Sequence, residues 1–148
     1  MKNLFEASTV EEVISRIERL RADAPRQWGK MDVAQMMAHC TAALEMASGK
    51  FVAKRTLLGR ILGPRFRHLL TDEKPMPRNS PTAKELRVSS CDFDRERQRL
   101  RECVRQFQRG GESHCTKHPH PFFGPLTPNE WSTGMYKHLD HHLRQFGV

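Results

Sequence analysis

The chain has no apolar stretch close to the roughly 20 residues that a membrane-spanning helix needs. Its first residues, MKNLFEASTVEEV, lack the apolar core of a secretory signal peptide. The four cysteines (Cys40, Cys91, Cys103 and Cys115) lie far apart and form no CxxC pair, which argues against a disulfide framework. We therefore expect a cytoplasmic protein with reduced thiols and no membrane partner.

The sequence also has no internal repeat, no low-complexity tract and no strand-like alternation of polar and apolar residues. Four segments instead have helical periodicity, over residues 9–22, 33–48, 93–108 and 128–145. A length of 148 residues is typical of one domain with one core. We therefore predict a single all-α domain over residues 1–148, folded as a four-helix bundle with a long irregular connection between the second and third helices.

The starts of three helices have a recognisable pattern. Residues spaced as in a capping box precede each of them: Ser8 with Glu11, Asp32 with Gln35, and Thr127 with Glu130. Pro128 then takes the first helical position, where its missing N–H costs nothing. The connection over residues 50–90 is irregular, with a short broken helix expected within 55–70. Loops of this length are usually functional, so we treat it as a candidate part of a site.

The last helix carries the most informative pair of residues, His138 and His142. They are four residues apart, so they project from one face about one turn apart, a spacing that suits two imidazoles on one metal ion. The same face carries the apolar residues of the helix, so both rings point to the core. A buried imidazole needs a partner for each ring nitrogen, and two together indicate a metal ion or a dense polar network. His141 points about 60° away from His138 and is expected in an accessory position.

His39 is the best candidate for a third ligand. It lies in the middle of an apolar helix, where a polar group is costly unless it has a partner. Gln35, one turn away, would then support it as an accessory residue. The alternative is that Asp32, Gln35 and His39 form a polar row that faces water.

The loop over residues 110–126 offers a competing cluster of ligands. It contains four candidates within seven residues: His114, Cys115, His118 and His120. Closed zinc sites usually use separated pairs of ligands, so a second metal site here is the less favoured alternative. We expect this loop and the 50–90 connection to meet at the mouth of the main site, with His120 the loop histidine nearest to it.

Two stretches carry a resemblance to a known family. They are MMAHC in the second helix, shortly after residues 28–31, and HPFFGPLTPNEWSTGMYKHLDHHLRQFG at the end of the chain. They resemble the DinB-like superfamily of metal-binding four-helix bundles, within it a domain of unknown function of the 1569 type, and the likeness covers nearly the whole chain. The resemblance implies that His39, His138 and His142 hold a zinc, nickel or similar ion. Some members isomerise maleylpyruvate with mycothiol, and others transfer groups to bacillithiol or related thiols.

Three neutral imidazoles leave an open coordination position, as in catalytic zinc sites. We therefore expect a metal-dependent enzyme, either a thiol-dependent transferase or isomerase or a hydrolase, that uses the ion to activate a water or a thiol. The expected cofactors are one divalent ion, zinc or nickel, and a low-molecular-weight thiol. The expected substrate is a small anionic molecule or a thiol. The sequence identifies no general base.

Two other functions remain open. The first is a non-catalytic interaction or stress-response protein that a metal ion stabilises. The second is nucleic-acid binding, because 25 basic and 17 acidic residues give a net charge of +8. The basic residues are spread along the chain and are not interleaved with aromatic residues, so nucleic acid is the least favoured partner. Monomer and homodimer are both compatible with the sequence.

Overall fold

The computed structural model of the chain describes residues 1–80, 84–86, 88–89 and 92–148. These residues form α-helices and short 3-10 helices without a β-strand, which confirms the all-α prediction. The α-helices are α1 (Ala7–Glu18), α2 (Val33–Ala47), α3 (Leu57–Phe66), α4 (Phe93–Gly110) and α5 (Pro128–Gln145). The 3-10 helices are η1 (Arg67–Leu70), η2 (Lys84–Leu86) and η3 (Glu112–His114).

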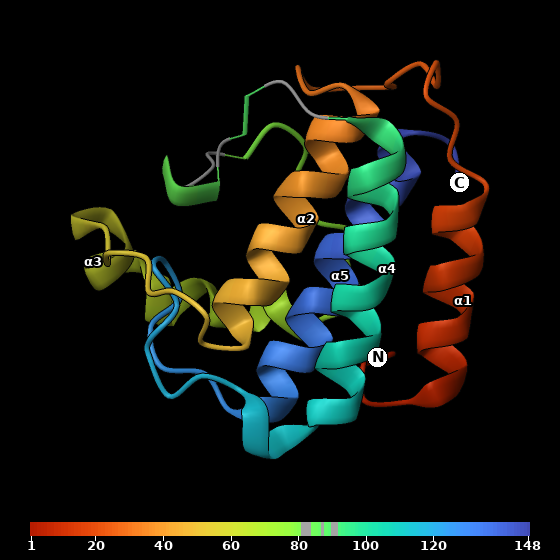
Figure 1. Ribbon diagram of the computed structural model, residues 1–148. Helices are drawn as coiled ribbons and strands as arrows, with labels where there is room; N and C mark the ends of the chain where they lie inside the picture. Colours follow the sequence, from red (N-terminus) through yellow and green to blue (C-terminus); the bar gives the residue numbers. More distant parts are fainter. Residues whose placement is uncertain (81–83, 87, 90–91) are drawn as a thin grey trace.

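Four of the α-helices, α1, α2, α4 and α5, pack against one another (Figure 1). The helices α2 and α4 run in one direction, and α1 and α5 run in the other (Figure 1). A parallel pair needs a connection that returns the chain to its starting end, and residues 48–92 provide it. The short helix α3 belongs to this connection and lies at the outer edge of the molecule, far from α1 (Figure 1).

Two of the predicted helix starts are confirmed. The Asp32 side chain accepts a hydrogen bond from the Gln35 amide, and the Gln35 side chain accepts one from the Asp32 amide. Thr127 and Glu130 form the same reciprocal box at the start of α5, with Pro128 in the first turn. These boxes satisfy backbone donors that the first helical turn leaves without partners. They fix where α2 and α5 begin, and therefore which residues face each other across the core.

The predicted start of α1 is wrong. The helix begins at Ala7 after Glu6, which makes no side-chain cap, so Ser8 lies inside the first turn and forms no capping box. The reason is tertiary: the Phe5 ring stacks on Phe107 of α4, with ring centroids 5.7 Å apart. The Phe5 amide also donates to the Ser132 hydroxyl of α5. The contacts that Phe5 makes with α4 and α5 therefore determine where α1 begins. The helix also ends at Glu18, four residues before the predicted end.

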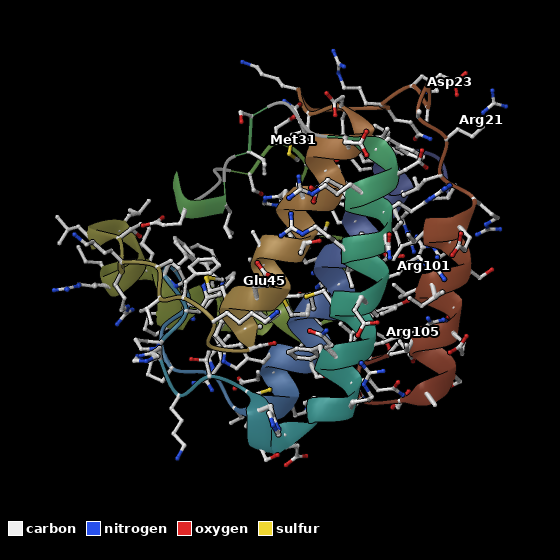
Figure 2. The ribbon with its side chains drawn as sticks, in the orientation of Figure 1. Arg21, Asp23, Met31, Glu45, Arg101 and Arg105 are labelled. Atoms are coloured by element: carbon white, nitrogen blue, oxygen red, sulfur yellow. The ribbon has the colours of Figure 1, made fainter. Side chains whose placement is uncertain are left out.

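Helix α2 is the most apolar of the packed helices and is buried on most sides. Nearly all of its residues are buried, as expected for a helix that is apolar around most of its circumference. On α4 the buried stripe consists of Leu100, Cys103, Val104 and Phe107, with the arginines on its other faces. One of these, Arg101, reaches toward α1, where its Nε lies 2.6 Å from a carboxylate oxygen of Glu18 (Figure 2).

The connection is held against α5 by two buried or half-buried cations. Lys137 is buried, and its ammonium group donates to the Leu69 and Asp72 carbonyls and to the Asp72 carboxylate. Arg67 of η1 forms a bidentate pair with the Glu130 carboxylate. These contacts place the segment that follows α3 beside α5. In the part of the chain that the structure describes, no helix has the length and apolar character needed to cross a membrane.

Candidate metal centre

Three histidines from two helices meet in the interior. His39 comes from the middle of α2, and His138 and His142 come from successive turns of α5. One ring nitrogen from each lies within 4.8 Å of the others, and the ring centroids are 4.7 to 4.9 Å apart. The helices α2 and α5 are in contact, so this cluster lies where their mid-sections face each other. The structure thus brings together the three residues that the sequence analysis selected.

His39 is held by a backbone carbonyl from the connection. Its Nδ1 lies 3.0 Å from the Leu86 carbonyl oxygen, which has no proton, so Nδ1–H donates. A neutral imidazole protonated at Nδ1 has its lone pair on Nε2. That Nε2 lies 2.9 Å from Nε2 of His138. The ring therefore presents an electron pair to the centre of the cluster.

His142 is oriented in the same way by a side chain. Its Nδ1 lies 2.8 Å from Oε1 of Gln145, one turn further along α5. The Gln145 amide nitrogen donates to the Trp28 carbonyl at 2.6 Å, so the amide oxygen must face the imidazole. His142 is then protonated at Nδ1, and its Nε2 lone pair is free. Hydrogen bonds of this kind fix the tautomer and the orientation of metal-binding histidines.

All three rings are kept neutral by their surroundings. Burial lowers the pKa of His39, although the bond to Leu86 opposes the shift. Burial, with the nearby His39, lowers the pKa of His142 to about 3. Burial also lowers the pKa of His138 well below its ordinary value, and His142 and His39 add to the effect. A neutral imidazole is the form that binds metal, so at pH 7 the cluster needs to release few protons to do so.

The donor set fits a divalent ion. Two of the three rings have their outer nitrogen on a fixed acceptor and an inner lone pair toward the third, His138. The close approach of His39 and His138 requires either a proton or a shared cation between the two nitrogens. His39 and His142 are buried, and His138 lies at the edge of the buried region. Imidazole suits zinc, nickel, copper and iron alike.

His141 lies beside the cluster. Its ring centroid is 5.1 Å from that of His142. The Trp28 indole N–H donates to His141 Nε2 at 3.4 Å, and the guanidinium of Arg78 lies 4.2 Å above the indole ring. Burial lowers the pKa of His141. The structure thus places it next to a cluster histidine, tied to the residue whose carbonyl holds Gln145.

The hydrogen bonds that the structure gives to the Gln35 side chain go to residues other than His39. The amide oxygen of Gln35 accepts from the Asp32 amide, and its amide nitrogen donates to the Ser89 carbonyl. The supporting contact that the sequence analysis gave to Gln35 is made by Leu86 instead. The Asp32–Gln35–His39 row does not lie in water as a unit, because His39 is buried while Asp32 is exposed.

The ligand cluster in the 110–126 loop is dispersed. His114 and His118 are exposed, and Cys115 is half-buried with its thiol directed to the Gly111 carbonyl. Within the described residues, the three-histidine cluster is the group of His, Cys, Asp and Glu side chains close enough to share an ion. The structure therefore does not favour the second metal site.

His120 has a different role from its loop neighbours. Its Nδ1 accepts hydrogen bonds from the Phe122 and Phe123 amides at 3.1 and 3.2 Å, and its ring packs on Trp131 in the first turns of α5. The loop also meets the connection, because the Thr56 amide donates to the Pro121 carbonyl. An accessory role for His120 at the site stays a prediction.

Three residues that surround the cluster were not predicted from the sequence: Leu86, Gln145 and Trp28. Gln145 lies three residues after His142, so helical spacing gave a signal that was available. Leu86 acts through its backbone carbonyl, and Trp28 through both its carbonyl and its indole. A backbone carbonyl in an irregular segment leaves no mark in the sequence.

Comparison with known proteins gives a family but no activity. Neither the curated proteins nor the solved structures contain a match to this chain. One family model matches residues 2–147, which is nearly the whole chain, and its description is "Protein of unknown function (DUF1569)". The chain, with its three-histidine cluster, therefore belongs to the DUF1569 family.

Proposed function

We propose that this protein is a DinB-like metal-dependent enzyme in which His39, His138 and His142 hold one divalent ion, zinc or nickel. The observation that carries the proposal is the cluster itself: three ring nitrogens within 4.8 Å of one another, from rings kept neutral by burial. Two of the rings are oriented by hydrogen bonds on their outer nitrogens. This is the arrangement of ligands and supporting residues that protein metal sites use.

The number of ligands supports catalysis over a purely structural role. Structural zinc sites are usually closed by four protein ligands, whereas catalytic sites have three and leave one position open. In the described part of the chain the cluster has three such ligands. When bound, the ion would lower the pKa of a coordinated water to about 7 or keep a coordinated thiol as the thiolate.

The surroundings of His141 support a small anionic substrate. A surface depression beside it is lined by Trp28, Lys74, Arg78 and Arg144, among others. Lys74 and Arg78 have no carboxylate partner within the described ranges of the chain, whereas Arg144 pairs with Asp140. Because the His141 ring lies against His142, this basic depression adjoins the cluster. The reaction class that we propose is thiol-dependent transfer or isomerisation, or hydrolysis.

The test begins with elemental analysis of the purified protein by plasma emission. We expect about one equivalent of zinc or nickel per chain, in line with a single three-histidine site. The loaded protein is then assayed with mycothiol, bacillithiol and glutathione, each with acidic and electrophilic acceptors, and with ester and amide substrates for hydrolysis. Turnover that a chelator abolishes and added metal restores would establish the enzyme. A protein that takes up no divalent ion would exclude the proposal, and metal without turnover would leave the non-catalytic stress-response function.

A further inference from the structure

The helix α3 is packed in an unusual way, with its smallest residues inward. Gly59 and Gly63 are buried against the loop at Phe122. A Cβ added to Gly63 would lie 1.9 Å from the Phe122 carbonyl oxygen, and one added to Gly59 would lie 2.6 Å from the Phe122 Cα. Both glycines are therefore required for the close approach of the two backbones. The Thr56 amide, which donates to the Pro121 carbonyl, anchors the start of the same face.

The large apolar side chains of α3 consequently point outward. The exposed fractions are 76% for Leu57, 60% for Leu58 and 71% for Ile61, and 38% each for Leu62 and Phe66. At 100° per residue these five positions fall within an arc of about 180°. Outside this helix and the neighbouring Val52, the terminal Met1 is the one large apolar side chain that the described chain exposes. The exposed apolar surface is thus concentrated in one place, and we call these five residues the α3 face.

The charges around the α3 face are of one sign. From Met46 to Thr71 the sequence contains no Asp or Glu. Lys54, Arg60 and Arg65 are exposed, and none has an ion-pair partner among the described residues. Arg60 and Arg65 belong to the helix itself. At 100° per residue Arg60 borders the α3 face, whereas Arg65 lies within its arc, near the end of the helix. An apolar face with unpaired cations at its edge and at its end has the composition of helices that lie in the surface of an anionic membrane.

The geometry favours a membrane over a second protein molecule. Two copies of the α3 face brought together would place the arginines of one against those of the other, without acidic residues from this segment to balance them. The helix lies at the outer edge of the molecule, so it can enter a flat surface without contact from the other helices (Figure 1). The lack of a membrane-spanning segment led to the expectation of no membrane partner, but it does not exclude binding at a membrane surface. We propose that α3 binds this protein to the surface of anionic phospholipid membranes, with the α3 face among the acyl chains and Lys54, Arg60 and Arg65 at the headgroups.

Two independent forces would contribute to such binding. Burial of apolar area in the interface supplies a term that salt does not weaken, and attraction between cations and anionic lipids supplies one that salt screens. The proposed binding needs no metal ion, because α3 contacts the 121–123 loop rather than the histidine cluster. A protein that lacks metal should therefore bind membranes as well as the loaded protein does.

The test is co-sedimentation of the full chain with vesicles of phosphatidylcholine, with and without phosphatidylglycerol. We expect binding that requires phosphatidylglycerol and that weakens as salt is raised. The double variant Leu58→Asp/Ile61→Asp should lose about ten-fold or more in partitioning into the vesicles. It places two carboxylates on the face that would otherwise lie among the acyl chains. The control Gln98→Asp/Gln106→Asp adds the same charge at exposed positions on α4 and should partition nearly as the wild type does. Circular dichroism would verify that both variants are folded.

Three results would overturn the proposal. The first is a folded wild type that does not sediment with anionic vesicles at low salt. The second is concentration-dependent dimerisation in analytical ultracentrifugation that Leu58→Asp/Ile61→Asp abolishes, since a second copy would then cover the face. The third is binding to polyglutamate at least as tight as to vesicles, which would assign the surface to an acidic protein. Anionic-lipid binding that the double variant loses and the control retains would establish it.

Discussion

The side chain of Gln145 joins His142 to the backbone at Trp28. Its amide oxygen lies 2.8 Å from Nδ1 of His142, and its amide nitrogen donates to the Trp28 carbonyl at 2.6 Å. A half-turn of the amide would place its oxygen against the Trp28 carbonyl, where neither oxygen can donate, so the observed orientation is preferred and Nδ1 of His142 carries the proton. A residue outside the predicted ligand set thus determines which nitrogen of His142 faces the cluster.

Gln145→Leu should therefore weaken metal binding while the three imidazoles remain. Loss of a hydrogen bond that orients a ligating histidine typically costs about 10- to 100-fold in metal affinity. Competition titration with a chromophoric chelator would measure the change. The matched control is Gln35→Leu, which removes the capping box of α2 but no hydrogen bond to His39. The control should lower the thermal midpoint and leave the affinity unchanged; equal losses of affinity in both variants would contradict the assignment.

Metal binding should require each of the three cluster histidines but should not require His141. We expect His39→Ala, His138→Ala and His142→Ala to purify without stoichiometric metal, since removing one of three ligands leaves too few for a stable site. His141→Ala should keep its metal, because His141 bonds to Trp28 and lies outside the cluster. Plasma emission on dialysed protein measures the content. The same metal content in wild type and His142→Ala would refute the site.

The sequence pointed to the residues of the cluster. The i, i+4 spacing of His138 and His142 and their place on the apolar face predict that both rings enter the core, and His39 was the favoured third residue, although a row facing water was also open. The lengths and order of the packed helices follow from periodicity and from two capping boxes. These are local patterns, and the structure follows them in α2 and α5 but not at the ends of α1.

The parts that could not be predicted depend on contacts between distant segments. The stacking of Phe5 on Phe107 moves the start of α1, although Ser8 and Glu11 have the spacing of a capping box. The Leu86 carbonyl reaches His39 from the short 3-10 helix η2, which the sequence did not predict. Gly59 and Gly63 read as helix-weakening residues in the sequence, and only the nearby Phe122 backbone explains them.

The close packing of Gly59 and Gly63 on the Phe122 backbone gives a prediction about the local stability of α3. Gly63→Ala places a methyl group against the Phe122 carbonyl, so the helix must shift, at a cost of about 1–3 kcal/mol typical of overpacking. Leu62→Ala, at an exposed neighbouring position, should cost within about 0.5 kcal/mol. Limited trypsin digestion at Arg60 and Arg65 would report the difference, with faster cleavage expected in Gly63→Ala alone. Equal cleavage rates would show that the close approach does not hold the helix in place.

The cysteines give a prediction about redox state. Cys40, Cys103 and Cys115 are free thiols, while Cys91 lies outside the described residues. Burial raises the pKa of Cys103 and that of Cys115 to about 11, so neither should react readily at pH 8 in the folded chain. Titration with a chromogenic disulfide reagent, without reductant, should find four thiols after unfolding. Two or none would overturn the prediction of a disulfide-free chain.

His120 gives a prediction about pH. Burial, with the nearby Arg55, lowers its pKa to about 4, against an ordinary value of 6.5. Between these values the unfolded chain binds a proton at this position and the folded chain does not. The free energy of unfolding should therefore fall as pH falls from about 6.5 toward 4, by at most about 1.4 kcal/mol per pH unit for this one proton.

The variant His120→Asn isolates this effect. An asparagine oxygen can accept the Phe122 and Phe123 amides in place of the imidazole Nδ1, but it does not titrate. Urea unfolding of both proteins at several pH values should show the stability of the wild type falling, relative to the variant, as pH drops below 6.5. Parallel stability curves, or an imidazole proton resonance of His120 that titrates near 6.5, would mean that the ring is not held in this buried turn.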